Sequence, residues 1–385
     1  MPDFKGPLSS KLPRAGTTIF TIMSALASEH KAINLSQGFP DFEVSSELIN
    51  LVYEKMKNGQ NQYAPMPGIQ LLREIISKKV KKLYSAAYDP ATEITVTAGG
   101  TQAIFTAILS VIKEGDEVIL FDPAYDCYAP AIELAGGIPV SLQLKPPSFS
   151  IDWNEVKRTI NQRTRMIMIN TPHNPTGSIL TARDMMQLEK LTKQTDILIL
   201  SDEVYEHIIF DGYEHQSVMR FPELVKRSFV VFSFGKTFHA TGWKCGYILA
   251  PSKLMAEFRK VHQFNVFSVN TPLQFALADF MSDEITYTGI EAMYARKRDY
   301  FLTLMKPSRF KPLDCHGSYF LLFDYSKISN EKDTDFAKRL TVEHGVASIP
   351  VSVFYKNPPD KKLLRFCFAK KDETLKAAAE RLCKV

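Results

Sequence analysis

Between residues 93 and 250, short runs of apolar residues alternate with segments in which apolar residues recur every three or four positions. Most of the short runs are apolar at every position, as is typical of strands in a parallel sheet with helices on both faces. Residues 181–193 form a helical pattern that opens with a variant capping box, Thr181 and Asp184. Another helical pattern covers residues 101–112. The predicted strands are residues 93–97, 117–121, 138–142, 165–169, 197–200, 229–233 and 246–250. This alternation predicts an α/β fold with a mostly parallel central sheet.

The pattern changes after residue 281, where a long charged helical segment (residues 291–305) precedes shorter strand patterns. Those strands are predicted at residues 318–323, 346–349 and 363–368, with a closing helix at 372–383. Together they predict a second, smaller α+β domain. We therefore expect an N-terminal segment (1–45) packed on the small domain, a large domain (46–285) and a small C-terminal domain (286–385).

Composition excludes several classes of protein. The 47 basic and 42 acidic residues give a net charge of +5, too small in a chain of 385 residues to predict a nucleic acid or a membrane as partner. No apolar signal segment is visible near the start. The charge-free stretch 94–112 is interrupted by Gly99 and Gly100, so it is not expected to span a membrane. The five cysteines are scattered, which predicts free thiols and a cytoplasmic protein.

Several common motifs are absent. The chain contains no Gly-x-Gly, so it lacks the usual dinucleotide-binding fingerprint. Gly235, Lys236 and Thr237 imitate the end of a P-loop, but the first glycine of that motif is missing. No Gly-x-Ser-x-Gly occurs, and no two histidines are four residues apart, so we expect no metal site.

Four polar segments follow predicted strands, at the sheet edge where open α/β folds bind ligands. Residues 97–102 contain Gly99, Gly100 and Thr101, and their free backbone N–H groups at a helix start suit a phosphate. The alternative is an ordinary turn with Thr101 as the helix cap. In residues 171–177, two prolines and a glycine leave Asn174 as the versatile hydrogen-bonding group, although a plain turn is again the alternative.

The other two segments carry charges. Asp202 ends the most apolar strand, so its carboxylate is expected to be desolvated and to need a positive partner; a helix cap is the alternative. Lys236 directly follows a strand, where partial burial would lower its pKa and suit imine chemistry, although most lysines are surface charges. Ser233 and Lys244 add a hydroxyl and a cation for a phosphate. A phosphate cradle, an amide, an acid and a reactive lysine are the groups that pyridoxal 5′-phosphate requires.

These four segments occur in order with three further motifs, at residues 34–41 (NLSQGFPD), 61–65 (NQYAP) and 364–369 (LRFCFA). Across its whole length the chain resembles the class I, fold-type I aminotransferases, and it is similar to the methionine and kynurenine (glutamine) aminotransferases among them. The resemblance implies a homodimeric, pyridoxal-phosphate-dependent enzyme that moves the amino group of methionine, or of a related apolar or aromatic amino acid, to a 2-oxo acid. A kynurenine/glutamine-type aminotransferase and a cysteine-S-conjugate β-lyase are alternatives on the same scaffold.

The resemblance also implies a role for each matching residue. Lys236 would form the imine with the cofactor and later carry a proton between substrate and cofactor. Asp202 would pair with the pyridine nitrogen, Tyr205 and Asn174 would hydrogen-bond the ring's 3-oxygen, and Tyr125 would stack on the ring. The phosphate would be bound by Gly100, Thr101, Ser233 and Lys244, and by Tyr63 from the neighbouring subunit.

For the substrate, the resemblance implies that Arg365 clamps the α-carboxylate, helped by Asn174 and the Gly38 N–H. The expected aromatic pocket includes Phe20, Phe39 and, from the partner chain, Phe267 with Ser268; such a pocket suits methionine or an aromatic ring. Kynurenine-type relatives commonly have a histidine at the position of Ser268, which weighs against kynurenine. Residues 264–270 contain no arginine, which weighs against a dicarboxylic substrate.

Overall fold

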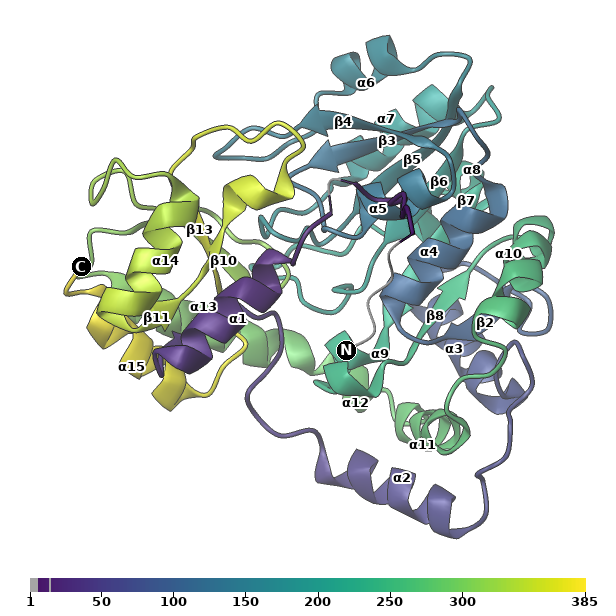
Figure 1. Ribbon diagram of the computed structural model, residues 1–385. Coiled ribbons are helices and arrows are strands. Elements are labelled where there is room, and N and C mark those ends of the chain that lie inside the picture. Colours follow the sequence, from purple (N-terminus) through teal and green to yellow (C-terminus); the bar gives the residue numbers. More distant parts are fainter. Residues whose placement is uncertain (1–5, 14) are drawn as a thin grey trace.

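A seven-stranded sheet forms the centre of the molecule in the computed structural model, which describes residues 6–13 and 15–385 (Figure 1). The strand order is β2-β8-β7-β6-β5-β3-β4, and only β8 runs antiparallel to its neighbours. This confirms the predicted α/β fold with a mostly parallel sheet. The strands are β2 (Ile94–Thr97), β3 (Glu117–Asp122), β4 (Ile138–Gln143), β5 (Thr164–Asn170), β6 (Leu198–Asp202), β7 (Ser228–Ser233) and β8 (Gly246–Leu249).

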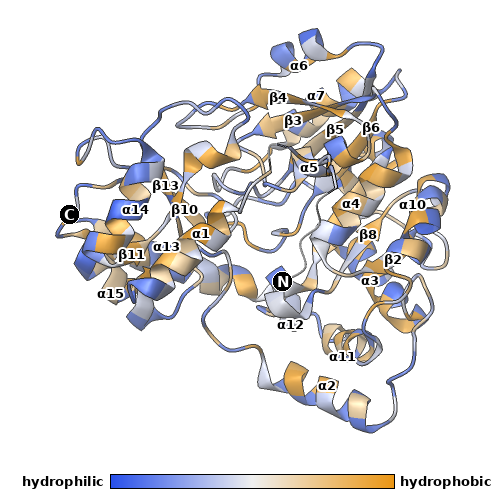
Figure 2. Ribbon diagram, viewed as in Figure 1, coloured by the Kyte–Doolittle hydropathy of each residue, from blue (hydrophilic) through white to orange (hydrophobic). Residues whose placement is uncertain are grey.

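Helices cover both faces of this sheet, because successive side chains of a buried strand point to opposite sides. In β5, Ile167 and Ile169 join the core formed with α3 (Gln70–Tyr84), α7 (Ala182–Thr192) and α11 (Thr271–Met281). Met166 and Met168 join the core formed with α4 (Gly100–Val111), α5 (Tyr128–Leu134) and α10 (Ser252–Asn265). Figure 2 shows these central strands as mainly hydrophobic, with hydrophilic residues in the surrounding helices and loops.

The expected capping box is present at the start of α7. The Thr181 side chain accepts a hydrogen bond from the Asp184 backbone N–H, and the Asp184 carboxylate accepts one from the Thr181 backbone N–H. The remaining helices of this part of the chain are α2 (Ser46–Lys57), α6 (Trp153–Thr159), α8 (Pro222–Val225), α9 (Phe234–Thr237) and α12 (Ile285–Thr288). Within the described ranges, no helix has the length and apolarity needed to cross a membrane.

A smaller group of strands and helices lies beside the central sheet (Figure 1). Its antiparallel sheet has the order β12-β13-β10-β9, with β9 (Lys311–Pro312), β10 (Phe320–Asp324), β12 (Ile349–Pro350) and β13 (Leu363–Cys367). Its helices are α13 (Ile290–Met305), α14 (Asp333–His344) and α15 (Asp372–Leu382). The single strand predicted at residues 346–349 is wrong: β11 (Val346–Ala347) and β12 belong to different sheets, because the first pairs with β1 and the second with β13.

The N-terminal segment packs against this smaller part. β1 (Ile33–Asn34) pairs in parallel with β11, and α1 (Ile19–Glu29) contributes Met23 to the apolar core that contains Phe336 and Leu375. These contacts agree with the expected packing of the N-terminal segment, while the division of the chain at residues 45 and 285 stays a prediction.

Gly246 allows the backbone to pack closely where β8 reaches the carboxyl end of the sheet. It pairs with Ser233 on one side and Thr97 on the other, and a Cβ here would lie 2.5 Å from the Phe232 carbonyl oxygen and 3.3 Å from Gly99 Cα. Both obstacles are backbone atoms, so they cannot rotate away as a flexible side chain would.

Replacing Gly246 with alanine should therefore lower the free energy of unfolding by about 1–3 kcal/mol, because it overpacks the sheet edge. Gly242→Ala is the matched control: a Cβ there has no atom within 4 Å, so its effect should stay within about 0.5 kcal/mol. Chemical denaturation at fixed protein concentration measures both values. Equal effects of the two substitutions would contradict this explanation.

Candidate active site

A cavity of about 200 Å³ lies at the carboxyl ends of β5, β6 and β7, beside the start of α4. This is the edge at which open α/β sheets place their ligands. Nine of the residues singled out from the sequence line it: Gly100, Thr101, Tyr125, Asn174, Asp202, Tyr205, Ser233, Lys236 and Lys244.

One end of this cavity has the groups that bind a phosphate. The backbone before α4 turns at Gly99, with φ +84°, and the first N–H groups of the helix follow it. Lys244 is close by, since a Cβ on Gly99 would lie 3.7 Å from Lys244 Nζ. Ser233, the last residue of β7, adds a hydroxyl. The alternative role of Thr101 as a helix cap is wrong, because Gly99 occupies that position and no side chain caps the helix.

Asp202 is the acid of the cavity and is almost completely buried at the end of β6. Burial raises its pKa to about 6, although hydrogen bonds from Tyr128 and from the Val204 backbone act in the opposite direction. No helix follows Asp202, since residues 204–207 form a turn, so the alternative role as a helix cap is wrong as well.

Tyr128 and Asn170 are partners of Asp202 that were not found from the sequence. The Tyr128 hydroxyl donates to Asp202 Oδ2 at 2.6 Å, and Asn170 Nδ2 donates to the Asp202 carbonyl at 2.8 Å. Asn170 Oδ1 also accepts from the Asn174 backbone N–H, so one side chain links two of the predicted segments. No motif in the sequence points to Tyr128, which begins α5 three residues after Tyr125.

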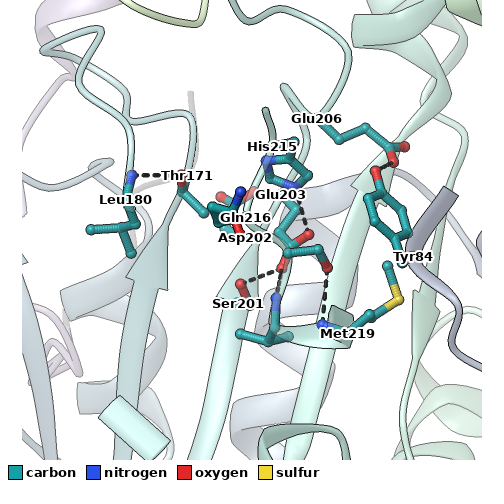
Figure 3. Close-up of polar contacts among 12 residues, drawn as sticks. Tyr84, Thr171, Leu180, Ser201, Asp202, Glu203, Glu206, His215, Gln216 and Met219 are labelled. Atoms are coloured by element: carbon teal, nitrogen blue, oxygen red, sulfur yellow. Dashed lines mark hydrogen bonds and ion pairs between the residues drawn. The ribbon is translucent and has the colours of Figure 1, made fainter. Parts of the chain in front are cut away.

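Two further buried carboxylates, both after Asp202 in the chain, hold this segment in place (Figure 3). Glu203 accepts hydrogen bonds from the Ser201 hydroxyl at 2.8 Å, from His215 Nε2 at 2.7 Å and from the Val218 backbone at 3.1 Å. Glu206 is hydrogen-bonded to Tyr84 and forms a buried ion pair with Lys79. Because each carboxylate is partnered, the segment that carries Asp202 and Tyr205 is fixed at several points.

Lys236 lies in the single turn of α9, directly after β7, and its amine points into the cavity. Burial lowers its pKa to about 8, while the negative charge of Asp202 acts to raise it. Its Nζ donates to Tyr319 Oη at 2.9 Å and to the Gly38 carbonyl at 3.3 Å. The contact of Gly38 with Lys236 is made by its carbonyl, and the role of the Gly38 N–H in binding the substrate carboxylate stays a prediction.

Arg365, in β13, is 1% exposed and reaches Asn174 from the smaller part of the molecule. Its Nη1 donates to Asn174 Oδ1 at 2.8 Å and its Nη2 to the Ser36 carbonyl at 3.0 Å. Its Nε is buried without a partner. The guanidinium lies 3.9 Å from the centre of the Phe320 ring and 5.3 Å from that of Phe20. A buried cation with a free donor is a site for an anionic group of a ligand.

The structure does not bring Tyr63, Phe267 and Ser268 into the cavity of their own chain. Tyr63 is 82% exposed and Phe267 is 51% exposed, and their rings meet edge to face at 5.3 Å. Ser268 Oγ donates to the Ala64 carbonyl at 3.0 Å and joins the two loops. Phe39 is also partly exposed, with Lys370 Nζ 4.5 Å above its ring.

The sequence and the structure of this chain are similar to those of known proteins. The model of the family "Aminotransferase class I and II" matches residues 30–382. The methionine aminotransferase of Escherichia coli (strain K12) is 51% identical over 374 residues, which cover 97% of each chain. Kynurenine--oxoglutarate transaminase 1 of Homo sapiens is 34% identical over 395 residues, or 93% of each chain.

A solved structure, YbdL from Escherichia coli, described as having a methionine aminotransferase function, superposes with a TM-score of 0.96. It is 50% identical to this chain, and the match covers 98% of this chain and 100% of that one. The chain is thus an aminotransferase and belongs to the class I and II aminotransferase family.

Proposed function

We propose that this aminotransferase depends on pyridoxal 5′-phosphate and moves the amino group of methionine, and of related apolar or aromatic amino acids, to a 2-oxo acid. The observation that carries the proposal is the single cavity that holds Lys236, Asp202 and a phosphate-binding end, with the buried Arg365 donating to its wall at Asn174.

The residues of the cavity fit this cofactor at each end. Gly100, Thr101, Ser233 and Lys244 would hold the phosphate, and the nearly buried Asp202 would pair with the pyridine nitrogen. Tyr205 and Asn174 would hydrogen-bond the ring's 3-oxygen, and Tyr125 would stack on the ring. When bound, pyridoxal phosphate supplies an electron sink for the carbon that loses its proton.

Lys236 would act as both nucleophile and base. A lysine with a pKa near 8 has a substantial fraction of neutral amine at physiological pH, whereas one with the ordinary value of 10.5 has very little. The neutral amine can attack a carbonyl carbon, and its lone pair can later take the proton from the substrate Cα. Tyr128 would assist indirectly by orienting the Asp202 carboxylate.

Arg365 would hold the substrate α-carboxylate. Asn174 and Ser36 fix two of its nitrogen atoms and leave Nε available, and the surrounding phenylalanine rings keep water away from the guanidinium. In such an apolar setting, a carboxylate would gain a charge-assisted hydrogen bond and satisfy the buried donor.

Aromatic side chains would select the substrate side chain. Phe20 lies beside Arg365, and Phe39 lies in the loop that contains Gly38. Contacts between a thioether and aromatic rings are favourable by about 0.3–1.5 kcal/mol each, so several of them favour methionine without excluding phenylalanine. The methionine aminotransferase named above, at 51% identity, supports the same substrate class.

A homodimer with shared active sites is part of the proposal. Tyr63, Phe267 and Phe264 are exposed aromatic residues, and Phe264 is 88% exposed. Such side chains on a surface are typical of an interface, where Tyr63 would reach the phosphate of the neighbouring subunit and Phe267 with Ser268 would complete its substrate pocket. A cytoplasmic location stays a prediction from the scattered cysteines.

The substrate proposal is tested by mixing the cofactor-loaded protein with methionine in the absence of any acceptor. We expect the absorbance of the covalently bound cofactor to fall and one equivalent of the methionine-derived 2-oxo acid to form, followed by recovery when a 2-oxo acid is added. Aspartate is the control and should react far more slowly, because its second carboxylate has no matching arginine in residues 264–270. Absence of reaction with methionine, phenylalanine and glutamine would contradict the proposal.

The pKa of Lys236 predicts how the apoprotein takes up its cofactor. Only the neutral amine attacks the aldehyde, so the uptake rate should rise with pH below about 8 and level off above it. Rapid mixing of apoprotein with pyridoxal phosphate, followed by absorbance from pH 6 to 10, gives this profile. Lys236→Ala is the control and should show no covalent absorbance at any pH. A rate that still rises about tenfold per pH unit above pH 9 would indicate an unperturbed lysine instead.

A further inference from the structure

Tyr319 and the Gly38 carbonyl surround the amine of Lys236 with hydrogen-bond acceptors. Lys236 Nζ is 2.9 Å from Tyr319 Oη and 3.3 Å from the Gly38 oxygen. Tyr319 Oη itself lies 2.5 Å from the same Gly38 oxygen. Tyr319 immediately precedes β10, and Gly38 lies in the loop after β1, so both acceptors come from outside the central sheet that carries Lys236.

The directions of these hydrogen bonds follow from the chemistry of the three groups. Burial raises the pKa of Tyr319 well above its ordinary value, so the phenol keeps its proton and donates it to the Gly38 carbonyl. The phenol oxygen can then only accept from Lys236. A neutral amine has two N–H groups and one lone pair. The two acceptors use both N–H groups and leave the lone pair free.

The two acceptors are held rigidly. Tyr319 has no exposed surface, and its ring packs at 5.0 Å from Tyr205 and at 4.9 Å from Phe320. A side chain at residue 38 is not possible without rearrangement, because a Cβ on Gly38 would lie 2.6 Å from Phe320 Cζ. Because both acceptors are closely packed, they fix one position at which the Lys236 amine can donate to both of them.

We propose that Tyr319, together with the Gly38 carbonyl, holds the Lys236 amine whenever it is not bonded to the cofactor, and orients its lone pair for proton transfer. This inference rests on the proposed function. The proton leaves the substrate Cα and enters the lone pair, which converts the amine to an ammonium group with three N–H bonds. Two of these N–H bonds continue to donate to Tyr319 Oη and to the Gly38 carbonyl. The third proton leaves when the neutral amine is regenerated.

The charged and titratable groups around the amine come from several elements. Asp202 on β6 and Cys367 on β13 raise its pKa, while Arg365 on β13 and Lys244 after β7 lower it. Tyr319 differs from all of these, because its hydroxyl is in direct hydrogen-bond contact with Nζ.

The test is Tyr319→Phe, which removes the hydroxyl and retains the ring that packs on Tyr205 and Phe320. The matched control is Tyr294→Phe in the same aromatic cluster: its ring lies 5.9 Å from Tyr319, and its hydroxyl bonds His239 Nδ1 at 3.0 Å rather than Lys236. Thermal denaturation first establishes that both variants are folded. Tyr319→His, which keeps an aromatic ring and a polar edge, serves as the second variant if the phenylalanine variant unfolds.

Two readouts, the pH midpoint of cofactor uptake and the kinetic isotope effect, separate positioning of the amine from a merely structural role. The two acceptors stabilise the ammonium form of Lys236 more than its neutral amine. Loss of the Tyr319 oxygen should therefore lower the pH midpoint of cofactor uptake by at least half a unit. In the reaction with methionine, the rate should fall about tenfold to a hundredfold, as expected for the loss of one hydrogen bond to a charged group. The kinetic isotope effect with α-deuterated methionine should rise, because proton transfer becomes slower relative to the other steps.

An unchanged uptake midpoint together with an unchanged isotope effect in Tyr319→Phe would overturn the inference, and so would equal effects in Tyr294→Phe. Failure of the proposed function gives a different result, because the wild-type protein would then show no reaction with methionine at all. A wild-type protein that reacts, beside a Tyr319→Phe variant that behaves like the control, removes only the role of Tyr319.

Discussion

Removal of charged groups from water is the constraint on which this active site depends. Lys236 and Asp202 line one cavity at the edge of the central sheet, Arg365 donates to Asn174 in its wall, and burial shifts the pKa of all three toward the neutral form. A buried charge costs several kcal/mol unless it is paired and hydrogen-bonded. Hydrogen bonds to Asp202, Lys236 and Arg365 offset part of this cost, whereas Arg365 Nε is left without a partner.

The fold places these groups by ordinary features of an α/β protein. Parallel strands end at the same edge, so Asp202, which ends β6, and Lys236, which follows β7, are neighbours in space. The smaller part of the molecule supplies Arg365 and Tyr319. Arg365 donates to Asn174, and Tyr319 accepts from Lys236, so two hydrogen bonds to residues that line the cavity join the two parts of the chain.

The sequence was sufficient to predict the sheet and most of the cavity, because both depend on local patterns. Strand periodicity predicted the central sheet, and polar segments at strand ends predicted Asp202 and Lys236. Contacts between distant residues were not predictable in the same way: Tyr319 and Gly38 are 281 positions apart, and neither carries a motif that points to Lys236. The strand predicted at 346–349 was wrong for a related reason, since the pairing partners of its two halves, not its apolar pattern, decide where it divides.

Lys236, and no other lysine, is proposed to bond the cofactor. This proposal is tested most directly by reducing the cofactor-loaded protein with borohydride, digesting it and locating the modified residue by mass spectrometry. Reduction converts the imine to a stable secondary amine, so the label stays on the residue that formed it. We expect a pyridoxyl phosphate group on Lys236 and an unmodified Lys244, although both lysines line the same cavity. Modification of Lys244 or of a surface lysine, or no modification at all, would contradict it.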